Sequence, residues 1–314
     1  MLIWVSLHKV LNLDTLRRLF STRCHKTMAV FLADDKLPEL RDRLQHKPRY
    51  LKIYNEVITK LDSVVTGFHF IVDKWPDFKA VITKPNPETA EFEFLNNIYN
   101  VAAEDEKALS ELLEQQGVID WNRGIVFACV DTTFSEVLNE AIKSHGGSSD
   151  PSEPCYVQCV TQESLSVKPV PDGFKLLPLT QGDSKFVNSQ WKFTVGNESL
   201  AYIDKLITCL PSCCLYDQND AIVGFAMSYH YGALGMLHVM EEHRGKGYAK
   251  VIMSHLAQKR LQTGKEAFVV IEESNTVSLK LHEGLGFKQL PNLKVAWIRY
   301  TPKGTCKGPK SCCI

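Results

Sequence analysis

The second half of the chain alternates short apolar runs with amphipathic segments, and this pattern predicts strands that run in both directions. A hairpin is predicted from strands at 222–229 and 233–240, which a short turn joins. An amphipathic helix at 247–261 follows and leads to a β-branched strand at 268–271. Because a hairpin pairs antiparallel strands and a strand-helix-strand crossover connects parallel ones, we expect a mixed sheet.

Further elements are predicted on both sides of this region. The predicted helices cover 37–65, 105–116, 184–191, 199–209 and 275–283, and the predicted strands cover 78–82, 155–160, 213–216 and 294–300. The Gly-, Ser- and Pro-rich stretch 143–154 predicts a flexible surface loop near a domain boundary, and we assign the strand at 155–160 to the first domain. The expected fold is α/β (α+β), with domains at 29–167 and 172–302.

The segment 237–249, LHVMEEHRGKGYA, is suited to ligand binding because an apolar strand runs into a glycine-rich turn and then a helix. Gly245 and Gly247 allow backbone N–H groups to approach a ligand closely, and the helix start presents unpaired donors. Arg244 and Lys246 add positive charge at the same place. The segment predicts a pyrophosphate site, although the spacing alone also suits a plain turn with charges facing solvent.

About thirty residues downstream, Asn275, Ser278 and His282 share one helix face because they are three and four positions apart. Together the two segments resemble the GNAT superfamily of acyl-CoA transferases, which have an R/QxxGxG/A turn for the CoA pyrophosphate and a later N…LY…LGF helix. The matching residues are Arg244, Gly247 and Ala249 in the turn, and Asn275, Leu281, Leu285, Gly286 and Phe287 in the helix.

Three other segments are similar to the glycine N-acyltransferase family: VDKWPDFKAVI at 72–82, IDWNR at 119–123 and VNSQWKF…GNES…LPSCC within 187–214. The resemblance covers about residues 35–300. It implies a GNAT-type mixed sheet flanked by helices in the second domain, preceded by an α/β N-terminal domain. It also implies an enzyme that moves an acyl group from acyl-CoA, as co-substrate, to the amino group of glycine or a similar small amino acid.

The resemblance also implies where CoA binds. The site would be formed by the strand before the glycine turn, the turn itself and one face of the later helix. Its expected residues are Leu237, Val239, Arg244, Gly245, Lys246, Gly247, Ala249, Asn275 and Ser278.

Family members often carry a glutamate base on the strand before the turn, but the matching position here is Ala233. The candidate substitutes are His238 on the same strand, His230 in the preceding turn, or a water chain that ends on either. His282 stands where many GNAT enzymes have a tyrosine that protonates the CoA thiolate. We name His238 and His282 as candidate catalytic residues, and both residues also suit purely structural positions.

Two other functions stay open. A protein or peptide N-acetyltransferase would need an open groove for an extended chain, and a catalytically weak acyl-CoA binding protein is suggested by Ala233. The sequence does not identify the acyl group or the amino acid, because both depend on the shape of a pocket.

Composition narrows the class of partner. Lysine plus arginine equals aspartate plus glutamate at 36 each among 314 residues, which argues against a nucleic-acid partner. The sequence contains no run of about 18 consecutive apolar residues, which argues against a transmembrane helix. The ten cysteines show no repeated CxxC pairs, so no metal is expected. Small-molecule substrates are the expected partners, and the oligomeric state is left open.

Residues 1–28 contain five basic side chains and a single acid, Asp14, with leucines spaced for an amphipathic helix. This composition is typical of a mitochondrial transit peptide. The alternatives are an ordinary surface helix, or an upstream extension with the working start at Met28, and a cytoplasmic location. At the other end, the polar stretch 303–314 predicts a disordered tail.

Overall fold

The computed structural model describes residues 28–89 and 91–304. The transit peptide predicted at 1–28, except Met28, and residues 305–314 of the predicted tail lie outside the described residues. The described strands form two sheets. The larger has the order β1-β2-β3-β4-β5-β13-β7-β12, with β6 paired to β13 beside this path, and the smaller has the order β11-β10-β9-β8.

The strands in chain order are β1 (Val30–Phe31), β2 (Phe68–Val72), β3 (Ala80–Pro85), β4 (Ile98–Ala103), β5 (Ile125–Asp131), β6 (Ser148–Pro151), β7 (Cys155–Val160), β8 (Lys175–Leu177), β9 (Ser212–Tyr216), β10 (Ile222–Ser228), β11 (Leu234–Val239), β12 (Ala267–Glu272) and β13 (Lys288–Thr301). The α-helices are α2 (Leu37–Leu44), α3 (Leu51–Leu61), α4 (Glu106–Leu113), α5 (Ser135–Ser144), α6 (Ser184–Gln190), α7 (Asn197–Cys209), α8 (Tyr248–Gln262) and α9 (Thr276–Glu283). The α/β class and the mixed strand directions are confirmed.

The parallel pair in the larger sheet is not the one that the sequence pattern suggests. It is formed by β4 and β5, whereas β10 and β11 pair antiparallel as predicted. The crossover through α8 connects β11 and β12, which belong to different sheets. Among the described strands, no backbone pairing joins these two, and their separation leaves room for a cavity.

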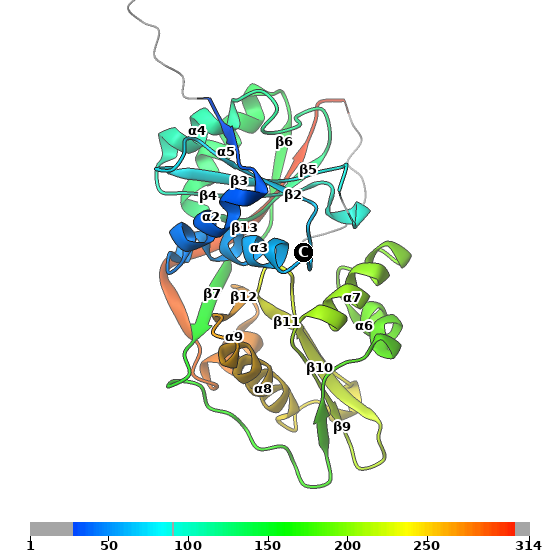
Figure 1. Cartoon of the computed structure of the whole chain (residues 1–314). Helices are drawn as coiled ribbons and strands as arrows, with labels where there is room; N and C mark the ends of the chain where they lie inside the picture. Colours follow the sequence, from blue (N-terminus) through cyan, green and yellow to red (C-terminus); the bar gives the residue numbers. More distant parts are fainter. Residues whose placement is uncertain (1–27, 90, 305–314) are drawn as a thin grey trace, which may run out of the picture.

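The last strand, β13, joins the two halves of the molecule and runs from the lower half to the upper half in Figure 1. It pairs antiparallel with β5 on one side and with β7 on the other. β7 then pairs with β12. The strand that we assigned to the first domain therefore lies between the last two strands of the chain. The larger sheet continues without a break across the predicted domain boundary.

The stretch 143–154 is not a loop throughout, and that prediction is wrong at β6. This short strand pairs with the end of β13, with Ser149 opposite Tyr300. A Cβ atom at Gly147 would lie 2.1 Å from the Tyr300 ring, so glycine permits this close approach. The small residues that suggested a flexible connection instead allow this segment to pack beside the Tyr300 ring.

Other differences have local causes. The helix predicted at 37–65 is interrupted before α3, where Pro48 starts a new turn and cannot donate a backbone hydrogen bond. The strands β2, β4 and β5 escaped prediction because they are almost wholly buried and show no polar alternation.

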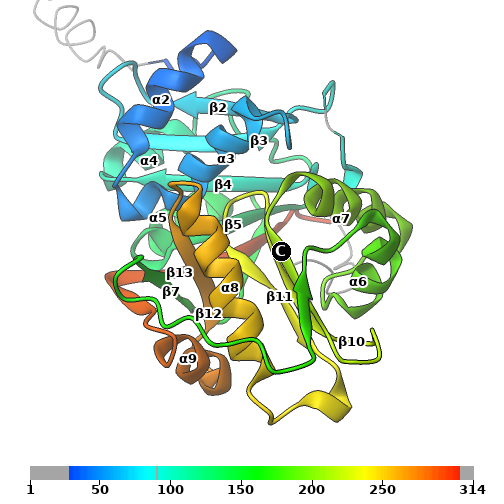
Figure 2. The same cartoon turned by 60° about the horizontal axis from the view of Figure 1, so that its bottom comes forward.

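Helix α8 packs against strands of both sheets. Figure 2 shows it with β12 on one side and β11 on the other. Its side chains Ile252, Leu256 and Ala257 are fully buried in a cluster that also contains Ala226 of β10 and Val269 of β12. The helix thereby holds the glycine turn that precedes it at the ends of strands from both sheets.

Candidate active site

A cavity of about 270 Å³ lies where β11 and β12 separate. One wall is the hairpin from the turn between β10 and β11 through Leu237. The opposite wall is the second half of β12, residues 269–272. The third side is the face of α9 that carries Asn275, Ser278 and His282. The helix face identified by sequence spacing therefore borders the cavity.

Hydrogen bonds within this part of the chain fix the α9 face. The Asn275 side chain accepts a hydrogen bond from the Ser278 N–H at 3.1 Å and so caps the helix. The Ser278 carbonyl oxygen in turn lies 2.8 Å from His282 Nδ1. The His282 ring also meets the Phe287 ring edge to face, with centroids 5.2 Å apart. His282 is thus held in one orientation.

These contacts determine which nitrogen of His282 carries the proton. A carbonyl oxygen only accepts hydrogen bonds, so Nδ1 is the protonated nitrogen. Burial lowers the pKa of His282, although its bond to Ser278 acts in the opposite direction. Within the described chain, Nε2 has no hydrogen-bond partner. A neutral His282 therefore presents a free base nitrogen in a nearly closed environment.

The turn before α8 has the geometry of an anion site. Gly245 and Gly247 have φ values of 77° and 85°, in the left-handed region that favours glycine. No described carbonyl accepts a hydrogen bond from the backbone N–H groups of 245–247. The first turn of α8 contains no acidic residue. Arg244 donates from Nε to the Val239 carbonyl oxygen at 3.1 Å.

Positive charge around this turn is available to a ligand. Among the described residues, neither Arg244 nor Lys246 forms an ion pair with a carboxylate, and both side chains are exposed. Ala249 lies on the first turn of α8, just behind the glycines. Unpaired N–H groups, a helix start and two free cations form a suitable cradle for a pyrophosphate.

The structure separates the two candidate catalytic histidines. β11 contains a bulge at Met236, where φ is 48°, and Leu237 after it lines the cavity. His238 and Val239 are not among the cavity-lining residues. The half-buried His238 ring stacks on Phe225 with centroids 5.8 Å apart. Burial and the nearby Arg244 lower the pKa of His238.

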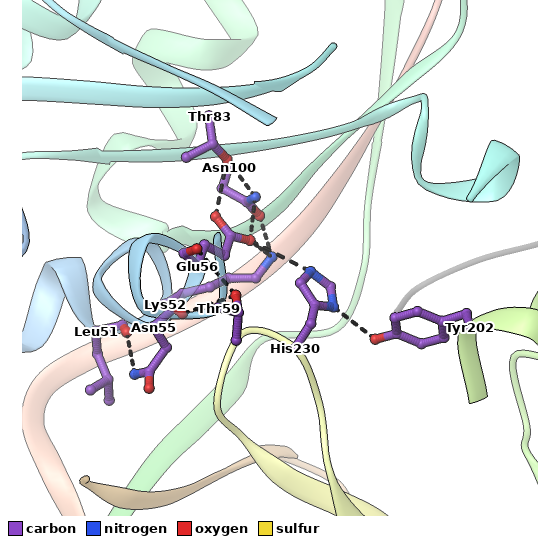
Figure 3. A network of polar contacts seen from close by, with 9 residues as sticks. All are labelled: Leu51, Lys52, Asn55, Glu56, Thr59, Thr83, Asn100, Tyr202 and His230. Carbon is purple, nitrogen blue, oxygen red and sulfur yellow. Dashed lines mark hydrogen bonds and ion pairs between the residues drawn. The ribbon is translucent and has the colours of Figure 1, made fainter. Parts of the chain in front are cut away.

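His230 lies at the tip of the hairpin, inside a buried polar network (Figure 3). Its Nδ1 is 2.7 Å from the Tyr202 hydroxyl, and its Nε2 is 3.9 Å from Glu56 Oε1. Burial, with a contribution from Lys52, lowers its pKa to about 3. His230 is therefore neutral at physiological pH, and it does not line the cavity.

The network connects the hairpin to α3. Lys52 and Glu56, one turn apart on α3, form an ion pair at 3.6 Å, and Asn100 donates to Glu56 at 2.6 Å. Burial raises the pKa of Glu56. The Lys52 ammonium also lies 4.7 Å from the Tyr231 ring centroid. Sequence reasoning missed these residues, because Lys52, Asn55, Glu56 and Thr59 form a polar helix face, which is typical of a side exposed to solvent.

The turn between β10 and β11 supplies a further part of the cavity wall. Tyr229, Tyr231 and Ala233 all line the cavity, and all are buried. Ala233 occupies the position where the resemblance led us to expect a glutamate. Its carbonyl oxygen accepts a hydrogen bond from the Tyr229 N–H at 2.8 Å. Position 233 therefore borders the cavity, and its side chain supplies no base.

Residues 28–89 and 91–304 contain neither a metal-ligand cluster nor a membrane-spanning helix. No group of three or more His, Cys, Asp or Glu side chains there is arranged to hold a metal ion. No helix in this part of the chain is both long and apolar enough to cross a membrane.

The sequence matches known proteins along most of its length. A family model described as aralkyl acyl-CoA:amino acid N-acyltransferase matches residues 28–211, and one described as FR47-like protein matches 214–298. Glycine N-acyltransferase of Bos taurus is 24% identical over 264 residues, which cover 78% of this chain and 90% of that protein. Glycine N-acyltransferase of Homo sapiens is 23% identical over 270 residues, covering 80% and 91%.

A second bovine relative, glycine N-phenylacetyltransferase, is 20% identical over 265 residues, covering 78% of this chain and 90% of that protein. Solved structures share the fold. A Drosophila protein superposes with a TM-score of 0.72 at 19% sequence identity. A tandem GNAT protein from the clavulanic acid biosynthesis pathway superposes with a TM-score of 0.54 at 11% identity. Each match covers 88% of this chain and 99% of the other chain. With its GNAT fold, this chain belongs to the aralkyl acyl-CoA:amino acid N-acyltransferase family.

Proposed function

We propose that this protein transfers an acyl group from acyl-CoA to the amino group of glycine or a similar small free amino acid. The observation that carries the proposal is the small cavity that contains His282, whose Nε2 has no partner among the described residues. A volume of about 270 Å³ suits a small acceptor better than an extended peptide. The names of the bovine and human relatives support glycine as the first acceptor to test.

The CoA part of the substrate is proposed to bind at the start of α8. Arg244, Lys246 and the N–H groups of the glycine turn would hold the pyrophosphate, with Ala249 allowing close approach behind it. The pantetheine would then follow β11 past Val239 and Leu237 toward the cavity. Asn275 and Ser278 would contact it from α9.

His282 is proposed to act first as a base. Nε2 removes a proton from the ammonium group, and the neutral amine attacks the thioester carbonyl. The C–N bond forms, the C–S bond breaks, and the second nitrogen proton passes to the departing sulfur. His282 then returns its own proton to solvent. This role differs from the proton donor expected from sequence, because the Ser278 carbonyl leaves Nε2 unprotonated in the neutral ring.

The test is release of CoA thiol from several acyl-CoAs, each alone and with glycine, glutamine or a short peptide. Release that depends on a free amino acid, with the acyl amino acid identified by mass spectrometry, supports the proposal. Release with the peptide alone would instead favour a peptide acetyltransferase. Acyl-CoA binding without turnover would favour a binding protein, the alternative suggested by Ala233.

We also propose that the chain is imported into mitochondria through residues 1–27. The basic, acid-poor composition of this segment supports the proposal. A fluorescent reporter that carries these residues should enter mitochondria, and the same reporter with the arginines and lysines of the segment replaced by glutamine should not. Diffuse signal from the unmodified segment would contradict import.

A further inference from the structure

Two hydrogen-bond donors that face the cavity have no acceptor among the described residues. Trp297 of β13 is 7% exposed, and its backbone N–H and C=O both pair with Ser152. Its indole Nε1 has no hydrogen-bond partner in residues 28–89 and 91–304. Tyr231 is 4% exposed, and its hydroxyl makes no hydrogen bond with any described residue. Both side chains line the same cavity.

The chemistry of these groups restricts what they bind. An indole N–H is only a donor, and a buried donor without an acceptor is unfavourable, so Trp297 calls for a ligand atom that accepts. The tyrosine hydroxyl can donate to the same group. Burial raises the pKa of Tyr231 well above its ordinary value, so the hydroxyl keeps its proton. An oxygen-rich group with several lone pairs would satisfy both donors.

The two donors and His282 come from different elements: Tyr231 lies on the hairpin turn and Trp297 on β13, whereas His282 lies on α9. Figure 1 shows the hairpin turn between β10 and β11 reaching toward α3, whereas α9 lies lower, beside α8. The thioester carbonyl must lie near His282 for the proposed reaction, and the rest of an acyl chain is apolar. The Tyr231 and Trp297 donors are therefore left for the amino-acid acceptor, whose carboxylate has two oxygens.

The carboxylates that line the cavity already have partners, because Glu272 accepts from Lys192 and Glu153 accepts from Ser274. The Lys52 ammonium is buried against the Tyr231 ring, with 4.7 Å between the nitrogen and the ring centroid. Figure 3 shows Lys52 beside the hairpin that carries His230. Glu56 balances part of this charge from 3.6 Å, and His230 is neutral. No acidic side chain lies on the turn itself, at 229–233.

We propose that the Trp297 indole N–H and the Tyr231 hydroxyl form the subsite that holds the carboxylate of the acceptor amino acid. This inference rests on the proposed function. If it holds, Trp297 on β13 and Tyr231 on the hairpin turn make the enzyme prefer amino acids to amines that lack a carboxylate. Neither residue was singled out by the sequence analysis.

The test compares Trp297→Phe and Tyr231→Phe with the parent enzyme, using glycine and glutamine and their carboxamides glycinamide and glutaminamide. Each variant should lower kcat/KM for the amino acids about 10- to 100-fold, the effect of one charge-assisted hydrogen bond, and change the carboxamides little. The KM for acyl-CoA should stay as in the parent. Trp121→Phe, in the N-terminal half and outside the cavity, is the matched control.

Equal losses for amino acids and carboxamides, an increased KM for acyl-CoA, or unchanged kinetics in both variants would each overturn the subsite. Two independent variants guard against misfolding of one, and acyl-CoA binding reports folding of each. If the parent acylates no amino acid at all, the proposed function itself has failed. If the parent acylates amino acids and both variants retain its preference for a carboxylate, only this inference has failed.

Discussion

At the residue scale, the protonation state of His282 follows from one hydrogen bond, because the Ser278 carbonyl can only accept. Burial lowers the pKa of His282 below its ordinary value of about 6.5. The ring is charged below its pKa and neutral above it. At saturating amino acid, the rate should therefore rise with pH through a midpoint below about 6.5 and then level off.

His282→Gln should lower kcat by about 10² to 10⁴, the usual cost of losing a positioned base. The remaining rate should keep rising into alkaline pH, because solvent must then supply the neutral amine. His238→Gln is the matched control, since His238 does not line the cavity, and it should change kcat little. Loss of activity in His238→Gln with none in His282→Gln would reverse the assignment. pH profiles of kcat between 5 and 10 decide it.

Ala233 allows a second test of the missing carboxylate. Ala233→Glu places an acid at the cavity wall and should raise the rate of the His282→Gln variant most at neutral pH, where base is scarce. The gain should shrink at alkaline pH. Ala233→Gln has a similar size without the charge and should give no gain. Thermal melting should first show that both variants are folded. Equal rates in the Glu and Gln variants would then show that position 233 cannot place a base.

At the element scale, the start of α8 carries the predicted CoA contacts. Arg244→Glu combined with Gly247→Val should abolish acyl-CoA binding, because the first change reverses a charge and the second strains and blocks the backbone cradle. Gly264→Val is the control for strain, since Gly264 has a φ of 72° at the opposite end of the same helix. Calorimetric titration with acyl-CoA should show binding by the control variant. Parent-like affinity in the double variant would refute this site.

At the scale of the whole molecule, the exchange of strands makes the two halves dependent on each other. β13 lies between β5 and β7, and β7 lies between β13 and β12. Fragments 28–167 and 172–304 should therefore be unfolded or aggregated when expressed separately, because each exposes strand edges that the other covers. Co-expression should restore acyl-CoA binding. A cooperative thermal transition in isolated 172–304 would contradict this dependence.

The sequence by itself determined the features that depend on a few neighbouring residues. Glycine is favoured where φ is positive, so the left-handed backbone of the turn at Gly245 and Gly247 was readable from their positions. Spacing of three and four placed Asn275, Ser278 and His282 on one helix face. Hydrophobic periodicity likewise located α8 and the strands β9, β10 and β11, because these patterns repeat within one element.

Only the tertiary structure decided which distant residues meet. The pairing of β13 with both β5 and β7 joins strands more than a hundred residues apart, and no local pattern encodes that register. The same packing removes His238 from the cavity and brings Tyr231 and Trp297 into it. Local backbone preferences act within a turn or two of chain. The composition of the cavity depends instead on how separate elements bury their surfaces against one another.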